Sequence, residues 1–301
     1  MNNQKCYIVA GHKVAIIYNN VSSGDEALLT NFDPFLVKPQ GDFILPGEVA
    51  LTLVVDNQAD IAISSDEIGQ FDCGGCNHGV YQTAEGGYQF EVSNVQGELC
   101  STMESNPDFT QCRVKLHHAM PSMKRYGLNN AMMMAYAFCF SSCDTVLVHA
   151  SVIRKDGYGY LMIAPSGTGK STHTHLWFEN IPGCDLMNDD NPIVRLIDGQ
   201  AHVYGSPWSG KTPCYRNVQA PVGAFVRIQQ RPRNEIRRLS PLDAYTELLT
   251  SMSNMKWDRR VYTHVVDTII KIVACVGIYE LGCLPNGEAA RLCYETVAAK
   301  K

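Results

Sequence analysis

The sequence predicts an α/β protein. We expect a mixed, largely antiparallel sheet with flanking helices over residues 121–301, and a β-rich module over residues 1–120. Three observations predict this arrangement. Strand-like alternation runs through the first third of the chain, two Asp-Gly pairs separate apolar runs in the middle, and helical periodicity dominates the last third. A chain of 301 residues has room for one large domain or two ordinary ones.

The N-terminal region carries the pattern of strands. Residues 5–18 alternate Tyr, Val and Ile, residues 49–55 form a second candidate strand, and Tyr88–Val92 alternates cleanly. Gly86-Gly87 and Gly97 mark turns between them. No catalytic constellation stands out in this part of the sequence. We therefore expect a lid, a substrate-recognition module or an oligomerisation module here.

Helical spacing begins near residue 127. Apolar residues between Gly127 and Cys143 predict a mostly buried helix, with Asn129 or Asn130 as its N-cap. The change of pattern places the domain boundary between residues 115 and 127. Further on, Pro241–Met252, Arg260–Cys275 and Glu288–Ala298 suit helices, Ile278–Leu284 suits a strand, and Asn286 suits a cap for the last helix.

Residues 164–172 read Ala-Pro-Ser-Gly-Thr-Gly-Lys-Ser-Thr and carry the most specific chemical signal. They fit the phosphate-binding loop G-x-x-x-x-G-K-[ST], with Ala164 in place of the first glycine. Glycines allow backbone N–H groups to converge on phosphate oxygens, Lys170 supplies a charge, and Ser171 offers a hydroxyl to Mg²⁺. The predicted nucleotide-binding residues are Ser166, Gly167, Thr168, Gly169, Lys170, Ser171 and Thr172.

The surroundings of this loop match the motif. Gly159–Ile163 is a short apolar run typical of a strand, and Thr172–Glu179 can be helical. A helix that begins near Lys170 would add its positive end to the site. The alternative is a Gly/Ser-rich turn without a ligand.

Two Asp-Gly pairs flank the loop in sequence and predict antiparallel hairpins, because Asp-Gly between apolar runs favours a type I′ turn. The loop would then follow the second strand of a hairpin, which argues against the GTPase or motor-ATPase type. The paired runs are 146–153 with 158–163 around Asp156-Gly157, and 193–197 with 201–204 around Asp198-Gly199.

Asp189-Asp190 is the candidate acidic partner of the loop. It follows the short strand Leu186–Asn188 and lies 19 residues after Lys170, enough for a helix, a turn and a strand that returns beside the loop. One carboxylate can hold a metal, and the other can accept a proton from an attacking hydroxyl. The alternative is a pair that caps a turn before Pro192.

Further polar and aromatic candidates lie around these motifs. His149 follows an apolar strand, so it is either a core residue or a group that orients a phosphoryl group. Trp208, in a Gly/Ser/Pro loop, either anchors that loop or lines an acceptor pocket, with Lys211 or Arg216 on phosphate or substrate. The basic run Arg231, Arg233, Arg237 and Arg238 is a solvated face, or supplies one transition-state clamp.

The chain has twelve scattered cysteines, which favours reduced, buried thiols over a disulfide scaffold. One cluster is different. Cys73, Cys76 and His78 have spacing that can hold zinc, and a fourth ligand could come from later in the chain. The candidates for that ligand are Cys100, Cys112, His117 and His118. The Gly-Gly between Cys73 and Cys76 also reads as a plain turn, and the sequence contains no second C-x-x-C pair.

Composition excludes several classes of partner. A net charge of −5 lacks the positive excess that is typical of proteins that bind nucleic acid. No apolar run approaches the roughly 20 residues that span a membrane, and the start of the sequence lacks a signal-peptide core. We expect a cytoplasmic protein without nucleic-acid or membrane partners, and homo-oligomerisation stays open.

Taken in order, these motifs resemble the HPr kinase/phosphorylase C-terminal-domain-like family, which shares its core with phosphoenolpyruvate carboxykinase. The resemblance covers about residues 128–298. Its elements are the apolar helix, Val148–Ser151, the Asp-Gly hairpin, Ser166–Ser171 and Asp189-Asp190. Gly-Ser-Pro-Trp-Ser-Gly at 205–210 is closer to an HPr-kinase-related branch, some of whose members sit in peptide-modification gene clusters. The signature with which HPr kinases bind their protein substrate is missing, so HPr is not the expected acceptor.

The resemblance implies ATP and Mg²⁺, with phosphoryl transfer to a serine-like hydroxyl on a peptide, a protein or a small molecule. It implies Asp189 as general base, Lys170 and the loop amides on the phosphates, Ser171 and Asp190 on the metal, and His149 at the phosphoryl group. Two other functions stay open: phosphorolysis or carboxykinase-type chemistry at the same site, and a nucleotide-sensing module without catalysis. The choice of ATP over GTP is not decided by any motif.

Overall fold

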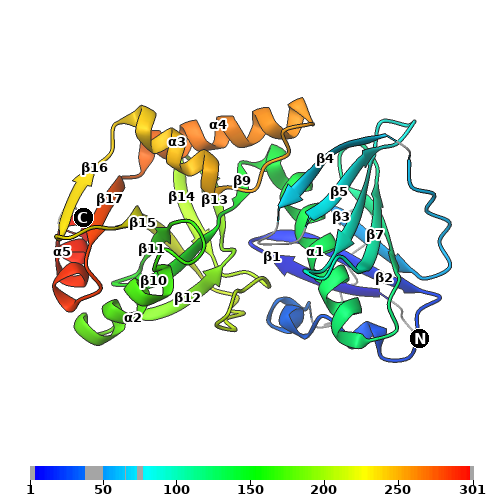
Figure 1. Cartoon of the computed structure of the whole chain (residues 1–301), viewed down its shortest axis with the longest axis horizontal. Coiled ribbons are helices and arrows are strands. Elements are labelled where there is room, and N and C mark those ends of the chain that lie inside the picture. The colour runs from blue at the N-terminus through cyan, green and yellow to red at the C-terminus, as the bar shows by residue number, and fades with distance from the viewer. Residues whose placement is uncertain (1–3, 38–49, 65, 73–76, 299–301) are drawn as a thin grey trace. The chain divides into compact units, whose positions relative to one another are not determined.

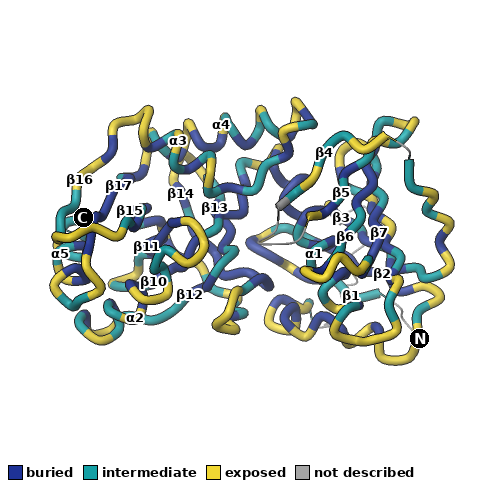
Figure 2. The backbone as a smooth tube through the Cα atoms, in the orientation of Figure 1, coloured by how far each residue is buried: buried dark blue, intermediate teal, exposed yellow. Residues whose placement is uncertain are grey.

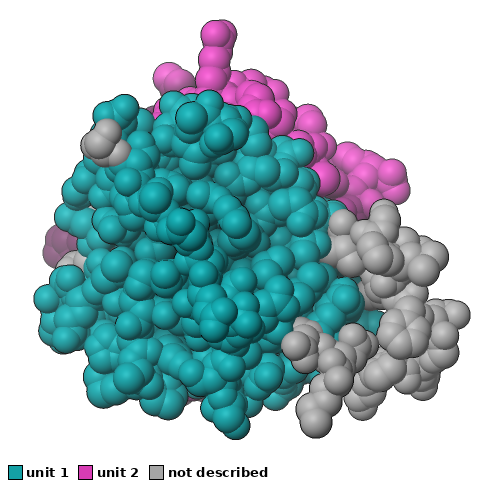
Figure 3. Space-filling model, turned by 90° about the vertical axis from the view of Figure 1, so that its right-hand side faces the viewer, with its two compact units in different colours: residues 1–139 teal, residues 140–301 magenta. Residues whose placement is uncertain are grey.

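The computed structural model describes residues 4–37, 50–64, 66–72 and 77–298. These residues form a mixed α/β structure with two mixed sheets. The chain divides into two compact units, Met1–Cys139 and Phe140–Lys301 (Figure 3). The prediction of a β-rich first part and an α/β second part is therefore confirmed at the level of fold class.

The first unit is built on an eight-stranded sheet in the order β1-β2-β3-β8-β7-β6-β5-β4 (Figure 1). The pairs β2·β3 and β3·β8 are parallel, and the other neighbours are antiparallel. The strands are β1 (Gln4–Val9), β2 (His12–Asn19), β3 (Leu51–Asp56), β4 (Glu67–Asp72), β5 (Asn77–Gln82), β6 (Tyr88–Ser93), β7 (Leu99–Ser105) and β8 (Gln111–Leu116).

Helix α1 (Pro121–Cys139) belongs to this first unit, which corrects the predicted boundary at residues 120/121. The helix packs on β7 and β8, and the ring of Phe138 lies 6.3 Å from that of Phe90 and 5.2 Å from that of Phe109. Because these aromatic rings are buried against one another, the helix packs on the sheet of the first unit, although the sequence pattern assigned it to the second.

The predicted start of this helix was also wrong. Asn129 and Asn130 lie inside α1, where Asn129 Oδ1 accepts a hydrogen bond from Asn31 and Asn130 donates to the carbonyl of Tyr126. The helix begins at Pro121 instead. Proline is favoured at a first helical position because its missing N–H has no partner there to lose.

A buried ion pair stabilises the start of α1. The Lys124 ammonium lies 2.9 and 3.0 Å from the two carboxylate oxygens of Asp25, and both residues are buried. Asp25 also accepts hydrogen bonds from the Ser22 amide and from Asn57. The pair connects positions 99 residues apart in sequence.

We predict that Asp25→Asn lowers the free energy of unfolding of the first unit by about 3–5 kcal/mol, because it leaves the Lys124 ammonium buried without its countercharge. Urea unfolding followed by circular dichroism measures the change. Glu26→Gln, at the exposed neighbouring position, is the control and should cost less than about 0.5 kcal/mol. Equal stability of the two variants would contradict the role of the ion pair.

The second unit is built on one sheet in which β12-β10-β11-β15-β14-β13-β9 follow one another, and β17 and then β16 continue from β15. Only β11·β15 and β15·β17 are parallel among the described pairs, so the sheet is mixed and largely antiparallel. The strands are β9 (Thr145–Leu147), β10 (Ala150–Lys155), β11 (Tyr158–Ile163), β12 (Asp185–Asp190), β13 (Ile193–Ile197), β14 (Gln200–Tyr204), β15 (Gln219–Gln230), β16 (Glu235–Arg238) and β17 (Ile278–Cys283).

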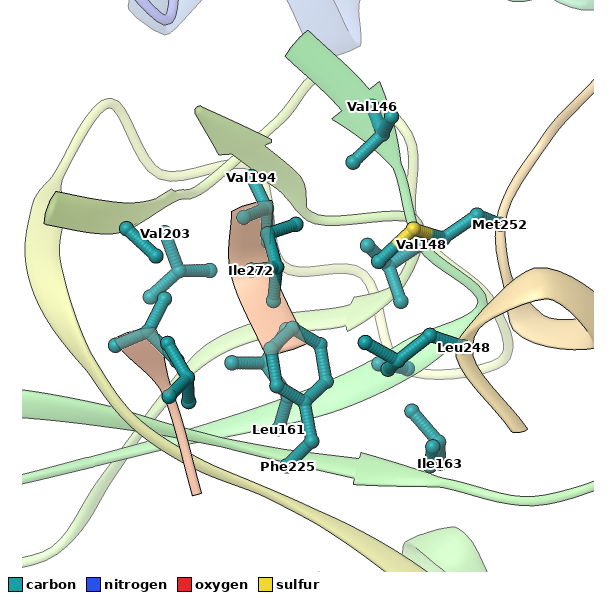
Figure 4. Close-up of a cluster of buried hydrophobic side chains, with 14 of the residues drawn as sticks. Val146, Val148, Leu161, Ile163, Val194, Val203, Phe225, Leu248, Met252 and Ile272 are labelled. Carbon is teal, nitrogen blue, oxygen red and sulfur yellow. The ribbon is translucent and has the colours of Figure 1, made fainter. Parts of the chain in front are cut away.

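Helices cover both faces of this sheet (Figure 1). Helices α3 (Pro241–Ser251) and α4 (Arg259–Cys275) pack on one face, where Leu248, Ile272 and Phe225 join a buried cluster (Figure 4). Helices α2 (Lys170–Asn180) and α5 (Gly287–Ala298) pack on the other face through a separate cluster that includes Trp177. The central strands β10, β11 and β15 are consequently buried along most of their length (Figure 2).

Both predicted Asp-Gly hairpins are confirmed. Strands β10 and β11 pair antiparallel around Asp156 (φ 50°) and Gly157 (φ 80°), and β13 and β14 pair around Asp198 (φ 51°) and Gly199 (φ 77°). Positive φ at both central residues is the requirement of a type I′ turn. The predicted strand 146–153 is broken, however, because β9 ends at Leu147 and β10 begins at Ala150.

The C-terminal elements also lie where the sequence predicts them. Asn286 Oδ1 accepts a hydrogen bond from the Ala289 amide, which confirms the expected cap of α5. The Asp258 carboxylate caps α4 by accepting from the amides of Arg260 and Val261. None of the described helices is long and apolar enough to cross a membrane.

The described cysteines are all free thiols, as predicted. Several are buried, whereas Cys143 and Cys275 are exposed. Cys73 and Cys76 of the predicted zinc cluster lie outside the described residues. Within the described ranges, no group of three or more His, Cys, Asp or Glu residues has the arrangement of a metal site. His78 itself is fully buried, and burial lowers its pKa to about 4.

Candidate active site

Three strand ends meet at one edge of the second unit. Ala150 begins β10, and it pairs with Ile163 at the end of β11 on one side and with Asp190 at the end of β12 on the other. The chain then leaves β11 into the loop 164–169, and α2 begins at Lys170. This register brings the glycine-rich loop, the aspartate pair and His149 to the same edge.

The loop has a backbone that requires its glycines. Gly167 has φ 77° and Gly169, the N-cap of α2, has φ 120°. A Cβ at either position would meet no atom within 4 Å, so the left-handed torsion and not crowding demands glycine. Gly169 offers no side chain to cap α2, which leaves the first-turn amides of the helix available to an anion.

A continuous chain of polar contacts joins Lys170, His149 and Asp190. The Lys170 ammonium lies 2.7 Å from His149 Nε2 and donates to the carbonyl of Ala164 at 2.7 Å. His149 Nδ1 lies 3.0 Å from Asp190 Oδ1. An ammonium can only donate and a carboxylate can only accept, so these partners select the neutral His149 tautomer with its proton on Nδ1.

The charge of Lys170 is influenced by both aspartates. Burial lowers its pKa, while the carboxylates of Asp190 and Asp189 oppose that shift. The two carboxylates therefore act on the same ammonium. Loss of hydration makes the ammonium an effective partner for a phosphate group.

Asp189 and Asp190 occupy different environments. Asp189 is buried, with 8% of its surface exposed, and its carboxylate accepts from the Thr212 amide at 3.4 Å. Asp190 is partly exposed and adopts φ 115°, a left-handed torsion that is costly for a residue with a side chain. Its second carboxylate oxygen accepts from the side chain of Asn191 at 2.6 Å.

The segment 205–214 forms hydrogen bonds with β12, the strand that carries the aspartates. Gly210 N and Ser209 Oγ donate to the carbonyl of Asp189, at 2.5 and 2.9 Å. Asn188, on β12, donates to Ser206 Oγ and to the carbonyl of Trp208. A Cβ on Gly210 would lie 3.1 Å from Asp190 Cβ, so a glycine permits this close approach.

Buried polar contacts join helix α2 to β10 and also connect two side chains within the helix. Thr174 donates to Ser151, a residue that pairs with Asp189 across β10 and β12. Trp177 Nε1 donates to His173 Nε2 at 3.0 Å. Burial lowers the pKa of His173 to about 4, so its imidazole is neutral near pH 7 and can accept this hydrogen bond.

Other candidates from the sequence lie away from this edge or have a structural role. Trp208 is 2% exposed and anchors its own loop, and it lines neither of the two cavities beside the glycine-rich loop. Arg216 pairs with Asp185 at the opposite end of β12, and Lys211 is exposed. Arg233 and Arg237 pair with Glu235 and Glu280.

Two cavities flank the loop, and their lining residues come from opposite faces of the sheet. The first, of about 450 Å³, lies beside Thr168, Gly169 and Thr172 and has mainly apolar walls. Those walls include Leu176, Ile228, Leu284 and Pro285, and Arg231 contributes to its rim. The second, of about 210 Å³, lies beside His149, Ala164 and Pro165 and is lined further by Arg227, Glu247, Thr250 and Ser251.

Sequence reasoning missed Arg227, Glu247 and Gln230. Arg227 lies on β15 beside Ile163, and Gln230 donates to the carbonyl of Thr168 in the loop. Charged residues on a strand otherwise filled with apolar residues, such as Arg227 in Ala-Phe-Val-Arg-Ile, were a signal that could have pointed to the site.

Comparisons with known proteins leave the family open. No protein-family profile and no curated protein sequence matches the chain. Among solved structures, the HPr(Ser) kinase/phosphatase from Coxiella burnetii is similar over 51% of this chain and 93% of its own, at 12% identity and a TM-score of 0.30. A likeness at this level does not establish a shared fold.

We predict that Asp190→Gly is more stable than Asp190→Ala by about 1 kcal/mol. Both variants lose the contact with His149, but only glycine adopts φ 115° without strain. Thermal unfolding of the two proteins measures the difference. An alanine variant as stable as the glycine variant would mean that the torsion at residue 190 costs nothing.

Proposed function

We propose that residues 140–301 form a Mg²⁺-dependent ATP phosphotransferase that transfers a phosphoryl group to a serine-like hydroxyl. The observation that carries this proposal is the contact chain Lys170–His149–Asp190, with Asp189 beside it, at the start of a helix that follows a glycine-rich turn. A site for phosphate binding alone needs the loop and the lysine, but not two carboxylates near enough to act on the charge of that lysine.

Each residue takes a role that its environment supports. The first-turn amides of α2 and Lys170 bind the phosphates, with Lys170 exchanging His149 for a phosphate oxygen. His149 then faces the transferred phosphoryl group, held in orientation by Asp190. Asp189 accepts the proton of the acceptor hydroxyl, whose oxygen bonds to phosphorus as the bond from phosphorus to ADP breaks.

The donor set near the loop fits Mg²⁺. Asp190 supplies a partly exposed carboxylate and Ser171 an exposed residue on the first turn of α2, and hard oxygen donors of this kind are those that Mg²⁺ prefers. When bound with ATP, the ion would neutralise charge on the phosphates. Because Mg²⁺ keeps several waters, a site with few protein ligands is sufficient.

The cavity of about 450 Å³ suits the nucleoside. In a loop of this type the helix residues after the lysine lie toward the inner phosphates, and Thr172 lines this cavity. Its apolar walls at Leu176, Ile228 and Leu284 can cover the flat faces of a base. The nucleoside and the transferred phosphoryl group would then lie at opposite ends of the loop.

The central test replaces Lys170 and Asp189. We predict that Lys170→Ala weakens ATP binding about 10- to 100-fold, because a charge-assisted contact to phosphate is lost. Asp189→Asn should keep ATP binding and lower turnover about 10²- to 10⁴-fold, because the general base is lost. Calorimetry measures binding, and ³¹P NMR with serine, threonine and a serine peptide measures transfer.

Lys256→Ala and Asp198→Asn, both at exposed positions, are the controls and should behave as the parent protein. Full phosphotransfer by both site variants would overturn the assigned roles. Tight ATP binding by the parent protein without transfer to any hydroxyl would favour a nucleotide-sensing module instead.

A second prediction concerns the nucleoside cavity. Leu176→Glu places a charge in its apolar wall and should weaken ATP binding about tenfold, while the affinity for pyrophosphate stays unchanged. Leu242→Glu, on the exposed face of α3, is the matched control. Equal losses for ATP and pyrophosphate in Leu176→Glu would place the effect on the loop and not on a nucleoside subsite. Calorimetric titration measures both ligands.

A further inference from the structure

The smaller cavity, of about 210 Å³, adjoins the loop at the end away from the proposed nucleoside subsite. It shares His149 with the contact chain, and Ala164 and Pro165 form the start of the loop beside it. A group bound in this cavity would therefore lie next to the position proposed for the transferred phosphoryl group.

The wall of this cavity carries one charge of each sign. Arg227 on β15 pairs in register with Ile163 on β11. Its side chain lies on the face of the sheet that α3 covers, where its guanidinium donates to the Glu247 carboxylate. Both side chains are partly buried, with 29% and 20% of their surfaces exposed. Burial raises the pKa of Glu247, while Arg227 opposes that shift.

A second carboxylate near Arg227, that of Glu280, is neutralised by other arginines. Glu280 lies 3.6 Å from Arg227, but it also lies 3.0 Å from Arg237 and 3.6 Å from Arg231. Arg227 and Glu247 are consequently the two opposed charges that face this cavity, and the hydroxyl-bearing residues Thr250 and Ser251 complete its lining.

We propose that this cavity is the acceptor subsite and that it takes a free hydroxyl-bearing α-amino acid of the serine class. Arg227 binds the carboxylate of the amino acid and Glu247 its ammonium group, so each protein charge exchanges its present partner for one on the substrate. The hydroxyl faces His149 and the loop. A serine inside a polypeptide has neither charge and would leave the Arg227–Glu247 pair unused.

The proposal rests on the proposed phosphotransferase function and specifies its acceptor. In the reaction, the serine oxygen forms a bond to the γ-phosphorus of ATP, the bond from that phosphorus to the β,γ-bridging oxygen breaks, and the serine proton passes to Asp189. The products are phosphoserine and ADP. The volume of the cavity suits one amino acid and not a folded partner.

The experiment supplies the full-length protein with Mg²⁺, ATP and either free L-serine or a serine tripeptide blocked at both ends, and detects products by ³¹P NMR. We expect phosphoserine from free serine. Glu247→Gln should raise the KM for serine about 30-fold or more, and Arg227→Lys about tenfold, with the Kd for ATP unchanged. Glu295→Gln and Arg233→Lys, at exposed positions outside the cavity, are the matched controls.

The outcomes separate this inference from the function on which it rests. Phosphorylation of the blocked peptide but not of free serine would overturn the amino-acid subsite and leave the phosphotransferase standing. Binding of ATP without a product from either acceptor would also overturn the subsite. Absence of ATP binding would overturn both proposals. Thermal melts of all four variants, with ATP calorimetry, identify any variant that fails only because it does not fold.

Discussion

The pairing of β10 with two neighbours is the constraint on which the site depends. Ala150 pairs with Ile163 and with Asp190, so the strand that delivers the loop and the strand that delivers the aspartates end at one level. A shift of this register by one residue would turn every side chain to the opposite face and separate the carboxylates from Lys170. The apolar clusters on both faces of the sheet hold the register, because each strand buries its own set of residues there.

The same sheet separates the two ends of the glycine-rich loop. Helices α2 and α5 cover the face beside the larger, apolar cavity, whereas α3 contributes Glu247, Thr250 and Ser251 to the smaller, charged one. Chemistry that needs two different substrates can thus use two differently lined cavities with one short loop between them. Strain and burial meet at this edge, in the positive φ of Asp190, the burial of Asp189 and the partial burial of Lys170.

Local patterns in the sequence were sufficient for most elements of the second unit. Asp156-Gly157 and Asp198-Gly199 predict their hairpins because a type I′ turn has strict torsional demands that few residue pairs meet. The start of α1 and the unit to which it belongs were missed because they depend on distant partners. Asp25, Asn31, Phe90 and Phe109 contact that helix from positions that no local window includes.

The sequence by itself determined the fold class, the glycine-rich loop and the acidic pair, because each depends on residue types at short, fixed spacings. Only the tertiary structure decided that His149 lies between Lys170 and Asp190, that Trp208 is an anchor, and that Arg227 and Glu247 border the loop. Those relations arise from strand register and from the packing of α3 on the sheet. They join residues up to about 100 positions apart in the sequence. Contacts over such separations are determined by burial and charge in the folded unit, so no short stretch of sequence predicts them.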